Sequence, residues 1–199
     1  YNPIKTNDWK RLNCNICKKK LNLNIKKKYI LFGAQGGLKS YRKGSDLFLD
    51  SLKSLSYLKN DFEIVILGSD KNYEKYINKF KFHFRKTVYT LNEQLMYHSI
   101  ADFTVIPSRE DNCPLFAIET LLCENPVVAF DTGGINEIVK DKNYGYLAKP
   151  FSSLDFARGI EYTVKNLNHK KIFKNRKKII KKFDEKNILK QYKKLFKKI

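Results

Sequence analysis

Two acidic side chains surround the start of a predicted helix. Asp111 lies in the polar segment 107–114, and Glu119 follows eight positions later, after Pro114. Proline suits the first turn of a helix, where its missing N–H is not needed. A ligand lying over this helix start would meet both carboxylates. The alternatives are an ordinary capping acid at Asp111 and a solvent-facing surface position for Glu119.

A glycine-rich segment with cations follows the first predicted strand. Residues 33–44 include Gly33, Arg42 and Lys43 and precede a predicted helix. Glycine lets a backbone approach a ligand closely, while lysine and arginine neutralise phosphate. In α/β sheets, ligands bind beyond the carboxyl ends of strands, beside helix N-termini. The segment therefore suits a phosphate, although a solvated strand-to-helix connection would have a similar composition.

A third loop of this kind contains Thr132, Gly133 and Gly134, directly after an apolar run at 126–130. The glycine pair permits another close approach of the backbone. A tight turn is the alternative interpretation.

The elements that must position these loops alternate along the chain. Short apolar runs predict strands at 29–32, 62–67, 86–89, 103–106, 127–130 and 146–148. Amphipathic stretches between them predict helices at 46–58, from a cap at Asn92, and at 114–124 with Leu115 buried. Strands that alternate with helices indicate a parallel sheet covered on both faces. The predicted fold class is α/β, a doubly wound, Rossmann-like sheet.

Three regions are expected along the chain. Residues 1–28 are polar and rich in Asn and Lys, which predicts an interdomain linker with a short helix rather than core. Residues 29–150 form the α/β domain. Residues 151–199 form a helical C-terminal tail, with helices at 154–167, 172–183 and 187–196.

Charge narrows the classes of partner. The chain has 40 Lys and Arg against 20 Asp and Glu, a net charge of +20, so anionic partners are favoured. Lysine is also scattered with Asn and Ile, which is typical of a compositional bias. The aromatics do not alternate with basic residues as in a stacking platform, so nucleic acid is an unlikely partner. A hydrophobic content of 42% excludes global disorder.

Cysteine and histidine give no metal site. Cys14 and Cys17 have the spacing of half a zinc site, but no second pair follows, so we predict free thiols in a reducing compartment. His83, His98 and His169 are predicted to be ordinary core or surface residues.

These loops, in this order, resemble the carboxy-terminal domain of glycosyltransferase family 4, retaining enzymes of the two-domain GT-B fold. The resemblance covers nearly the whole chain, from Tyr1–Ile4 to the closing helices. Its most specific block runs from Ile106 to Glu119, then through Asn125–Phe130 to Gly133 and Gly134.

The resemblance implies roles for individual residues. Asp111 and Glu119 would form the catalytic pair, with Asp111 contacting the donor sugar and Glu119 the ribose hydroxyls. Lys43 would bind the diphosphate, with Arg42 as a second cation. The expected donor site is completed by further residues: Gly33, Asn112, Thr132, Gly133 and Gly134.

The function implied is transfer of a sugar, with retention, from a nucleoside-diphosphate sugar to a glycan or lipid-linked acceptor in surface polysaccharide synthesis. No cofactor or metal is expected, and the acceptor domain is a separate N-terminal part, in cis or in trans. A cytoplasmic location is expected. The alternatives are a non-catalytic nucleotide-binding remnant or partner subunit, and a basic nucleic-acid-binding module.

The lysine-rich tail leaves one question open. Its helices carry an apolar face that includes Ile179, Phe183, Leu189, Leu195 and Phe196. We favour packing of this face on the domain. The alternative is peripheral contact with an anionic membrane at its inner face.

Overall fold

A seven-stranded sheet runs through the computed structural model, which describes residues 2–34, 36–69, 76–140, 142–166 and 169–197. The strand order is β3-β4-β2-β1-β5-β6-β7, and every pair is parallel except β3 with β4. The strands are β1 (Lys28–Gly33), β2 (Phe62–Leu67), β3 (Tyr76–Ile77), β4 (Phe80–Arg85), β5 (Phe103–Ile106), β6 (Val127–Phe130) and β7 (Gly145–Ala148). This confirms the doubly wound α/β class.

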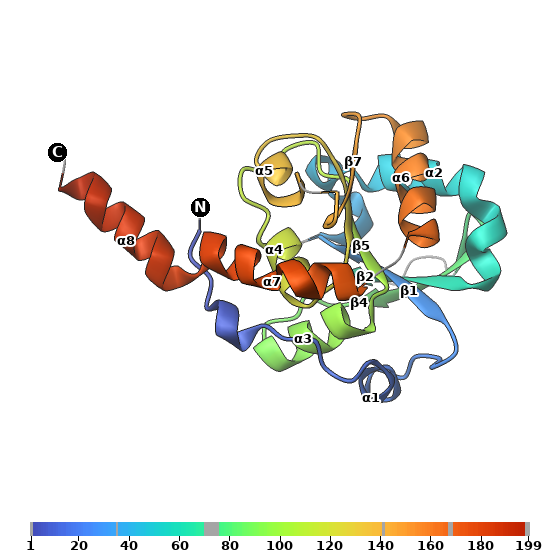
Figure 1. Cartoon of the computed structure of the whole chain (residues 1–199). Coiled ribbons are helices and arrows are strands. Elements are labelled where there is room, and N and C mark those ends of the chain that lie inside the picture. The colour runs from blue at the N-terminus through green and yellow to red at the C-terminus, as the bar shows by residue number, and fades with distance from the viewer. Residues whose placement is uncertain (1, 35, 70–75, 141, 167–168, 198–199) are drawn as a thin grey trace.

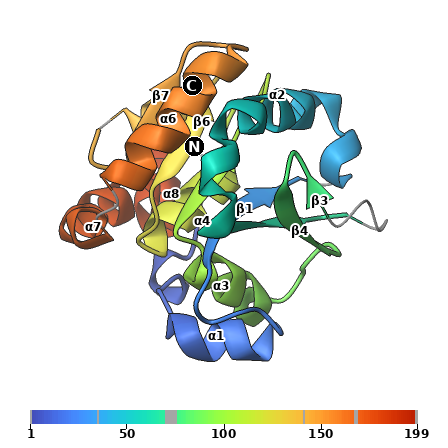
Figure 2. The ribbon, with the colours of Figure 1, turned by 90° about the vertical axis from the view of Figure 1, so that its right-hand side faces the viewer.

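Helices cover both faces of the sheet (Figures 1 and 2). One face carries α2 (Ser45–Ser51), the 3-10 segment Leu52–Asn60 and α6 (Ser153–Lys165). The other carries α3 (Leu91–Ile100), α4 (Leu115–Leu122), α5 (Ile135–Val139) and α7 (His169–Phe183). On that side α1 (Cys14–Lys20) packs against α3, and α8 (Glu185–Phe196) follows α7. Short 3-10 turns occur at Thr6–Asp8, Gly37–Lys39 and Tyr41–Lys43.

Successive side chains of a strand point to opposite faces of the sheet, and helices cover both faces, so the central strands are buried on both sides. Ile30 and Phe32 join the core beneath α2 and α6, whereas Tyr29 and Leu31 join the core beneath α3. All four side chains are at most 1% exposed. Continuous apolar runs, rather than strict alternation, are what such central parallel strands require.

The order of the strands creates a topological switch point, the place where successive connections leave the sheet in opposite directions. From β1 the chain crosses one face to β2, and from β4 it returns across the other face to β5 on the far side of β1. The connections that leave the carboxyl ends of β1 and β5 therefore diverge. Such a divergence is where open α/β sheets bind their ligands.

Five of the six predicted strands are confirmed, and the one at 86–89 is wrong. The strand is β4, at Phe80–Arg85, and residues 86–89 lie beyond its end. Phe80 and Phe82 are buried while Lys81 is half-buried. This period-two pattern of a strand next to the sheet edge is the signal that was missed.

Two predicted helix starts also need correction. Thr90, not Asn92, caps α3, because its Oγ1 accepts from the Glu93 N–H. Pro114 precedes α4 as its cap, and Leu115 is 38% exposed rather than buried because it lines an open cavity near Ile106 at the end of β5.

The N-terminal segment contributes more core than predicted. Ile4, Trp9, Cys17 and Leu23 are all buried. Ile4 donates its N–H to Phe183 O and accepts from the Glu185 N–H, which ties this segment to the end of α7. The expectation that residues 1–28 lie outside the core is therefore wrong, while the domain boundaries themselves stay a prediction.

The two tail helices behave differently. Ile172, Ile179 and Phe183 of α7 are buried against α4 and α5, which confirms packing for this helix. In contrast, α8 extends away from the body of the domain (Figure 1). Ile188 is buried, but Leu189, Tyr192, Leu195 and Phe196 are 42–69% exposed. Packing on the domain is wrong for most of α8.

Candidate functional site

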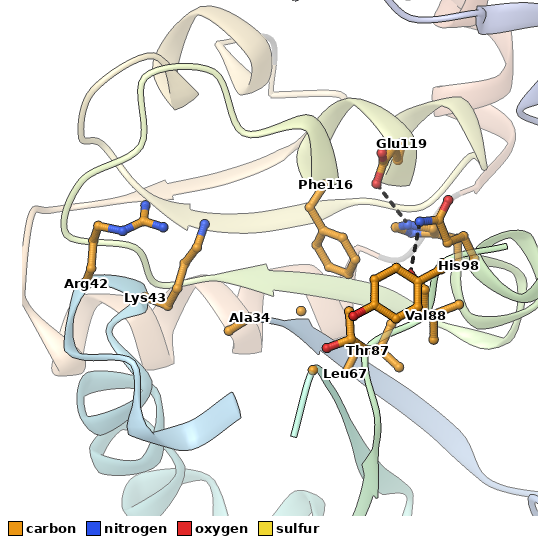
Figure 3. A pocket seen from close by; sticks show the side chains of 13 residues that line it. Ala34, Arg42, Lys43, Leu67, Thr87, Val88, His98, Phe116 and Glu119 are labelled. Carbon is orange, nitrogen blue, oxygen red and sulfur yellow. Dashed lines mark hydrogen bonds and ion pairs between the residues drawn. The ribbon is translucent and has the colours of Figure 1, made fainter. Parts of the chain in front are cut away.

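The candidate site lies at the switch point, where the loops after β1 and β5 meet. A cavity of about 420 Å³ opens there, a volume in the range of ligand pockets. Arg42 and Lys43 lie toward one side of it, and Thr87, Val88 and Glu119 lie toward the other (Figure 3). The cavity therefore has a cationic part and a part with a single carboxylate.

A second cavity of about 260 Å³ adjoins the first. The two share four lining residues, Gly33, Arg42, Lys43 and Phe116, so the cations stand between them. Asp111 lines the smaller cavity and Glu119 the larger one. The two predicted acids are thus brought to one site, but into separate compartments.

Lys43 and Asp111 form an ion pair across the two loops. Lys43 Nζ donates to Asp111 Oδ2 at 2.7 Å, and the side chains are 20% and 16% exposed. The pair holds the ammonium at the junction of the cavities. An anion that enters there competes with Asp111 for this cation.

Glycine allows the loops to pack backbone against backbone. A Cβ on Gly44, which has φ +66°, would lie 1.8 Å from Pro107 O. On Gly134 it would lie 1.9 Å from Asn112 O, and the Gly134 N–H donates to Asp111 O at 2.9 Å. These positions tolerate no side chain, because a carbonyl occupies its place.

The predicted donor-binding residues Asn112, Thr132, Gly133 and Gly134 lie outside the lining of both cavities. Thr132 Oγ1 donates to Ser108 O at 2.9 Å. The side-chain hydrogen bond of Thr132 and the closest approaches of Gly133 and Gly134 are all with residues of the loop 107–114. The backbone of the glycine pair therefore packs closely against this loop. Direct contact of these four residues with a donor stays a prediction.

Arg109, which lines neither cavity, ties the loop after β5 to the segment after β1 beside the site, a contact that sequence analysis missed. Its guanidinium makes two hydrogen bonds of 2.7 Å to the Asp46 carboxylate and a third to Tyr41 O. It also lies 3.9 Å over the Tyr41 ring. The hydrogen bonds and charge of Arg109 keep the pKa of Asp46 below its usual value. An arginine in a loop after a strand, beside predicted site residues, was the available signal.

The three histidines have distinct partners. His98 is buried, lines the larger cavity and faces Glu119, a place that sequence analysis did not predict. His83 bonds the buried Glu63 at 2.6 Å, and His169 lies 2.9 Å from Glu124 O. Burial lowers the pKa of both His83 and His169, so each favours the neutral form.

A parallel sheet with a cationic cavity at its switch point defines a doubly wound ligand-binding domain. Within this class, the chain belongs to the family of glycosyl transferases group 1, whose family model matches residues 15–182.

Comparisons with individual proteins agree with this family. The chain is 29% identical over 146 residues to an uncharacterized glycosyltransferase of Methanocaldococcus jannaschii, a match that covers 70% of this chain and 40% of that protein. It is similar in fold, at 18% identity and TM-score 0.77, to Anabaena HepE in complex with UDP and glucose, covering 100% of this chain and 56% of HepE.

A third comparison identifies which half of the architecture this is. The C-terminal domain of the group 1 glycosyl transferase LpcC of Francisella tularensis superposes with TM-score 0.70 at 20% identity, covering 90% of this chain and 97% of that domain. The fold is therefore the C-terminal half of a GT-B architecture. The chain spans only part of the whole proteins it matches, 40% of the Methanocaldococcus protein and 56% of HepE.

Two features are absent from the described part of the chain, a membrane-spanning helix and a cluster of metal-ligating side chains. None of its helices is long and apolar enough to cross a bilayer. No group of three or more His, Cys, Asp or Glu side chains there is arranged to hold a metal ion.

Proposed function

We propose that this chain is the donor-binding half of a retaining glycosyltransferase of family 4. Its reaction would transfer a sugar from a nucleoside-diphosphate sugar to a glycan or lipid-linked acceptor in surface polysaccharide synthesis. One observation carries the proposal: two adjoining cavities share Arg42 and Lys43, and each contains one carboxylate. The diphosphate belongs between the cavities, the nucleoside in the larger and the sugar in the smaller.

The chemistry follows from where charge develops. Negative charge builds on the diphosphate as its bond to the sugar breaks. Lys43 and Arg42 stabilise this charge, and one well-placed donor contributes about 3 to 4 kcal/mol in such sites. Glu119 accepts hydrogen bonds from ribose hydroxyls, and Asp111 accepts them from the sugar after Lys43 has turned to the phosphates. HepE, a protein of this fold, was solved with UDP and glucose, which supports this ligand class.

Calorimetric titration with UDP, GDP and ADP and their sugars tests the proposal. We expect selective binding by the chain and weaker binding by Glu119→Gln. The control is Glu161→Gln, the same change on α6 at a residue that lines neither cavity. Absence of binding to every nucleotide, or unchanged affinity in Glu119→Gln, would contradict the assignment.

Turnover is proposed to require an acceptor domain, supplied in cis or in trans. The partial coverage of the matched proteins supports this, because each contains a long region outside the match. Transfer measured with that domain present separates an enzyme from a nucleotide-binding remnant, which would bind donor without product. We also propose that transfer needs no metal ion, so full activity should persist in EDTA.

We further propose a cytoplasmic location with peripheral contact between α8 and an anionic membrane. The exposed Leu189, Leu195 and Phe196 share this helix with lysines such as Lys193 and Lys194, a combination that favours anionic lipid. Co-sedimentation with phosphatidylserine vesicles, but not with neutral ones, is expected, with less binding by the double variant Leu195→Ser, Phe196→Ser. No co-sedimentation would assign this face to a protein contact.

A further inference from the structure

His98 lies beside the cavity carboxylate and has little freedom to move. Its side chain, on the last turn of α3, is 1% exposed, and Nε2 lies 3.6 Å from Glu119 Oε2 (Figure 3). This distance is within ion-pair range but longer than a hydrogen bond. Nδ1 of the same ring lies 3.2 Å from Thr120 Oγ1. Both ring nitrogens therefore face the helix that carries Glu119.

Packing fixes the imidazole more firmly than the carboxylate. The ring centroid lies 4.7 Å from that of Phe116 and 5.6 Å from that of Trp9. The backbone carbonyl of His98 accepts from the buried Asn125 side chain. Glu119, by comparison, is 18% exposed and borders the cavity. In this arrangement the fixed imidazole of His98 can orient the more accessible carboxylate of Glu119.

The polarity of the contact follows from the chemistry of the two groups. A carboxylate oxygen attracts a ring N–H and repels a ring lone pair. Nε2–H is the form of His98 that stabilises the contact with Glu119. Nδ1 then accepts from the Thr120 hydroxyl, in competition with the Phe116 carbonyl, which lies 2.7 Å from the same Oγ1. Hydrogen bonds between functional groups often tighten when a ligand completes the site.

We infer that His98 is a positioning residue for Glu119, an inference that rests on the proposed function. It holds one carboxylate oxygen and leaves the second to accept hydrogen bonds from hydroxyl groups of the ligand. His98 acts through Glu119, so its contribution to nucleotide affinity depends on the presence of that carboxylate.

Two substitutions separate the two ring nitrogens. His98→Gln places an amide N–H near the position of Nε2, whereas His98→Asn keeps a polar group only near the position of Nδ1. Titration with UDP, GDP and ADP should show a roughly fivefold to tenfold loss for His98→Asn and a loss within about threefold for His98→Gln. Equal losses in the two variants, or no loss in either, would overturn the inference. Thermal unfolding of each variant verifies that it is folded.

A double-substitution cycle tests whether His98 acts through Glu119. In the Glu119→Gln background, His98→Asn should cause little further loss of affinity, because the group it orients is already changed. If the same fold-loss occurs in both backgrounds, His98 acts independently of Glu119 and the inference is wrong.

A measurement without nucleotide keeps the inference separate from the proposed function. The imidazole ¹⁵N signals of His98 in the intact chain should move on Glu119→Gln and remain in place on Glu161→Gln. Unchanged signals on Glu119→Gln would overturn the contact, whether or not the chain binds nucleotide. A clear shift in a chain that binds none of the three nucleotides would support the contact while rejecting the proposed donor site.

Discussion

The ion pair between Lys43 and Asp111 couples the two proposed subsites at the scale of single residues. Without donor, the ammonium has a carboxylate partner, so the cation and the acid are held in place by each other. Under the proposed function, a diphosphate would compete with Asp111 for Lys43, and that exchange would release the carboxylate toward the smaller cavity. Binding of the two parts of the donor would therefore be linked.

Opposite effects are expected from the two halves of this pair. Lys43→Met should weaken UDP affinity about tenfold to a hundredfold, because a hydrogen bond to a charged group is lost. Asp111→Asn should leave UDP affinity equal or higher, since the competing carboxylate is gone, while weakening the added affinity from the sugar. Calorimetry with UDP and UDP-glucose measures both, with Lys165→Met, at an exposed side chain of α6, as control. Weaker UDP binding by Asp111→Asn would contradict the exchange.

Residue identity alone did not indicate every contact at or beside the candidate site. Arg109 reaches Asp46, 63 positions earlier in the chain, and His98 meets Glu119 from a different helix. Neither pair has a local spacing that a sequence pattern would detect. The acids Asp111 and Glu119 were predictable because a single helix start carries both.

Among the structural elements, the loops determine the geometry of the candidate site more than the helices or strands do. The loop after β5 is held from one side by Gly44 and from the other by Gly133 and Gly134. Each contact is backbone against backbone, so the loop has little room for adjustment. Its acid, Asp111, is thereby set at a fixed distance from the cations.

Gly44→Ala and Gly36→Ala differ in one physical respect. Both glycines have left-handed φ, +66° and +88°, but a Cβ at Gly36 would make only an ordinary van der Waals contact, 3.9 Å from Ser40 Cβ, whereas one at Gly44 collides with Pro107 O. We expect Gly36→Ala to cost about 1 kcal/mol of unfolding free energy from strain alone. Gly44→Ala should cost clearly more and also weaken nucleotide affinity. Urea denaturation and calorimetry measure both, and equal stability costs would show that the loop can move aside.

The position of β4 shows that alternation of buried and less buried residues predicts a strand better than apolar composition does. The apolar and β-branched character of residues 86–89 suggested a strand, but the alternating Phe residues at 80–84 formed it. Residues 87–89 instead line the cavity at the carboxyl end of β4. A period-two pattern beside the sheet edge was more informative than local composition.

The pH dependence of the stability of the whole molecule should depend on His83, whose side chain is partly buried at 13% exposure. Burial lowers the pKa of His83 despite its bond to Glu63. Burial raises the pKa of Glu63, but hydrogen bonds and charge from His83 and Lys81 outweigh it, so the net shift is downward. The folded chain thus keeps His83 neutral at a pH where the unfolded chain, with a histidine pKa near ~6.5, takes up a proton.

Unfolding temperature should therefore fall as pH decreases below about 6.5. The stability associated with Glu63 is present above its unfolded pKa, near ~4.3, and is lost as pH falls further toward its folded value. His83→Gln keeps an N–H for Glu63 and removes the titration, so its melting temperature should change less between pH 7 and pH 5. Differential scanning calorimetry over this range measures the slope, and identical slopes in both proteins would contradict the role of His83.

The sequence by itself determined the class of fold, five of the six predicted strands and the glycosyltransferase character of the chain, while family 4 and retention stay predictions. Those features depend on periodicity and on glycine, proline and acid positions that are close together in the chain. The tertiary structure decided that Thr132 to Gly134 hold a loop, that Arg109 clamps Asp46, that His98 faces Glu119 and that α8 stands apart. These depend on strand order and on which face each crossover takes, which bring together residues whose separation along the chain carries no local pattern.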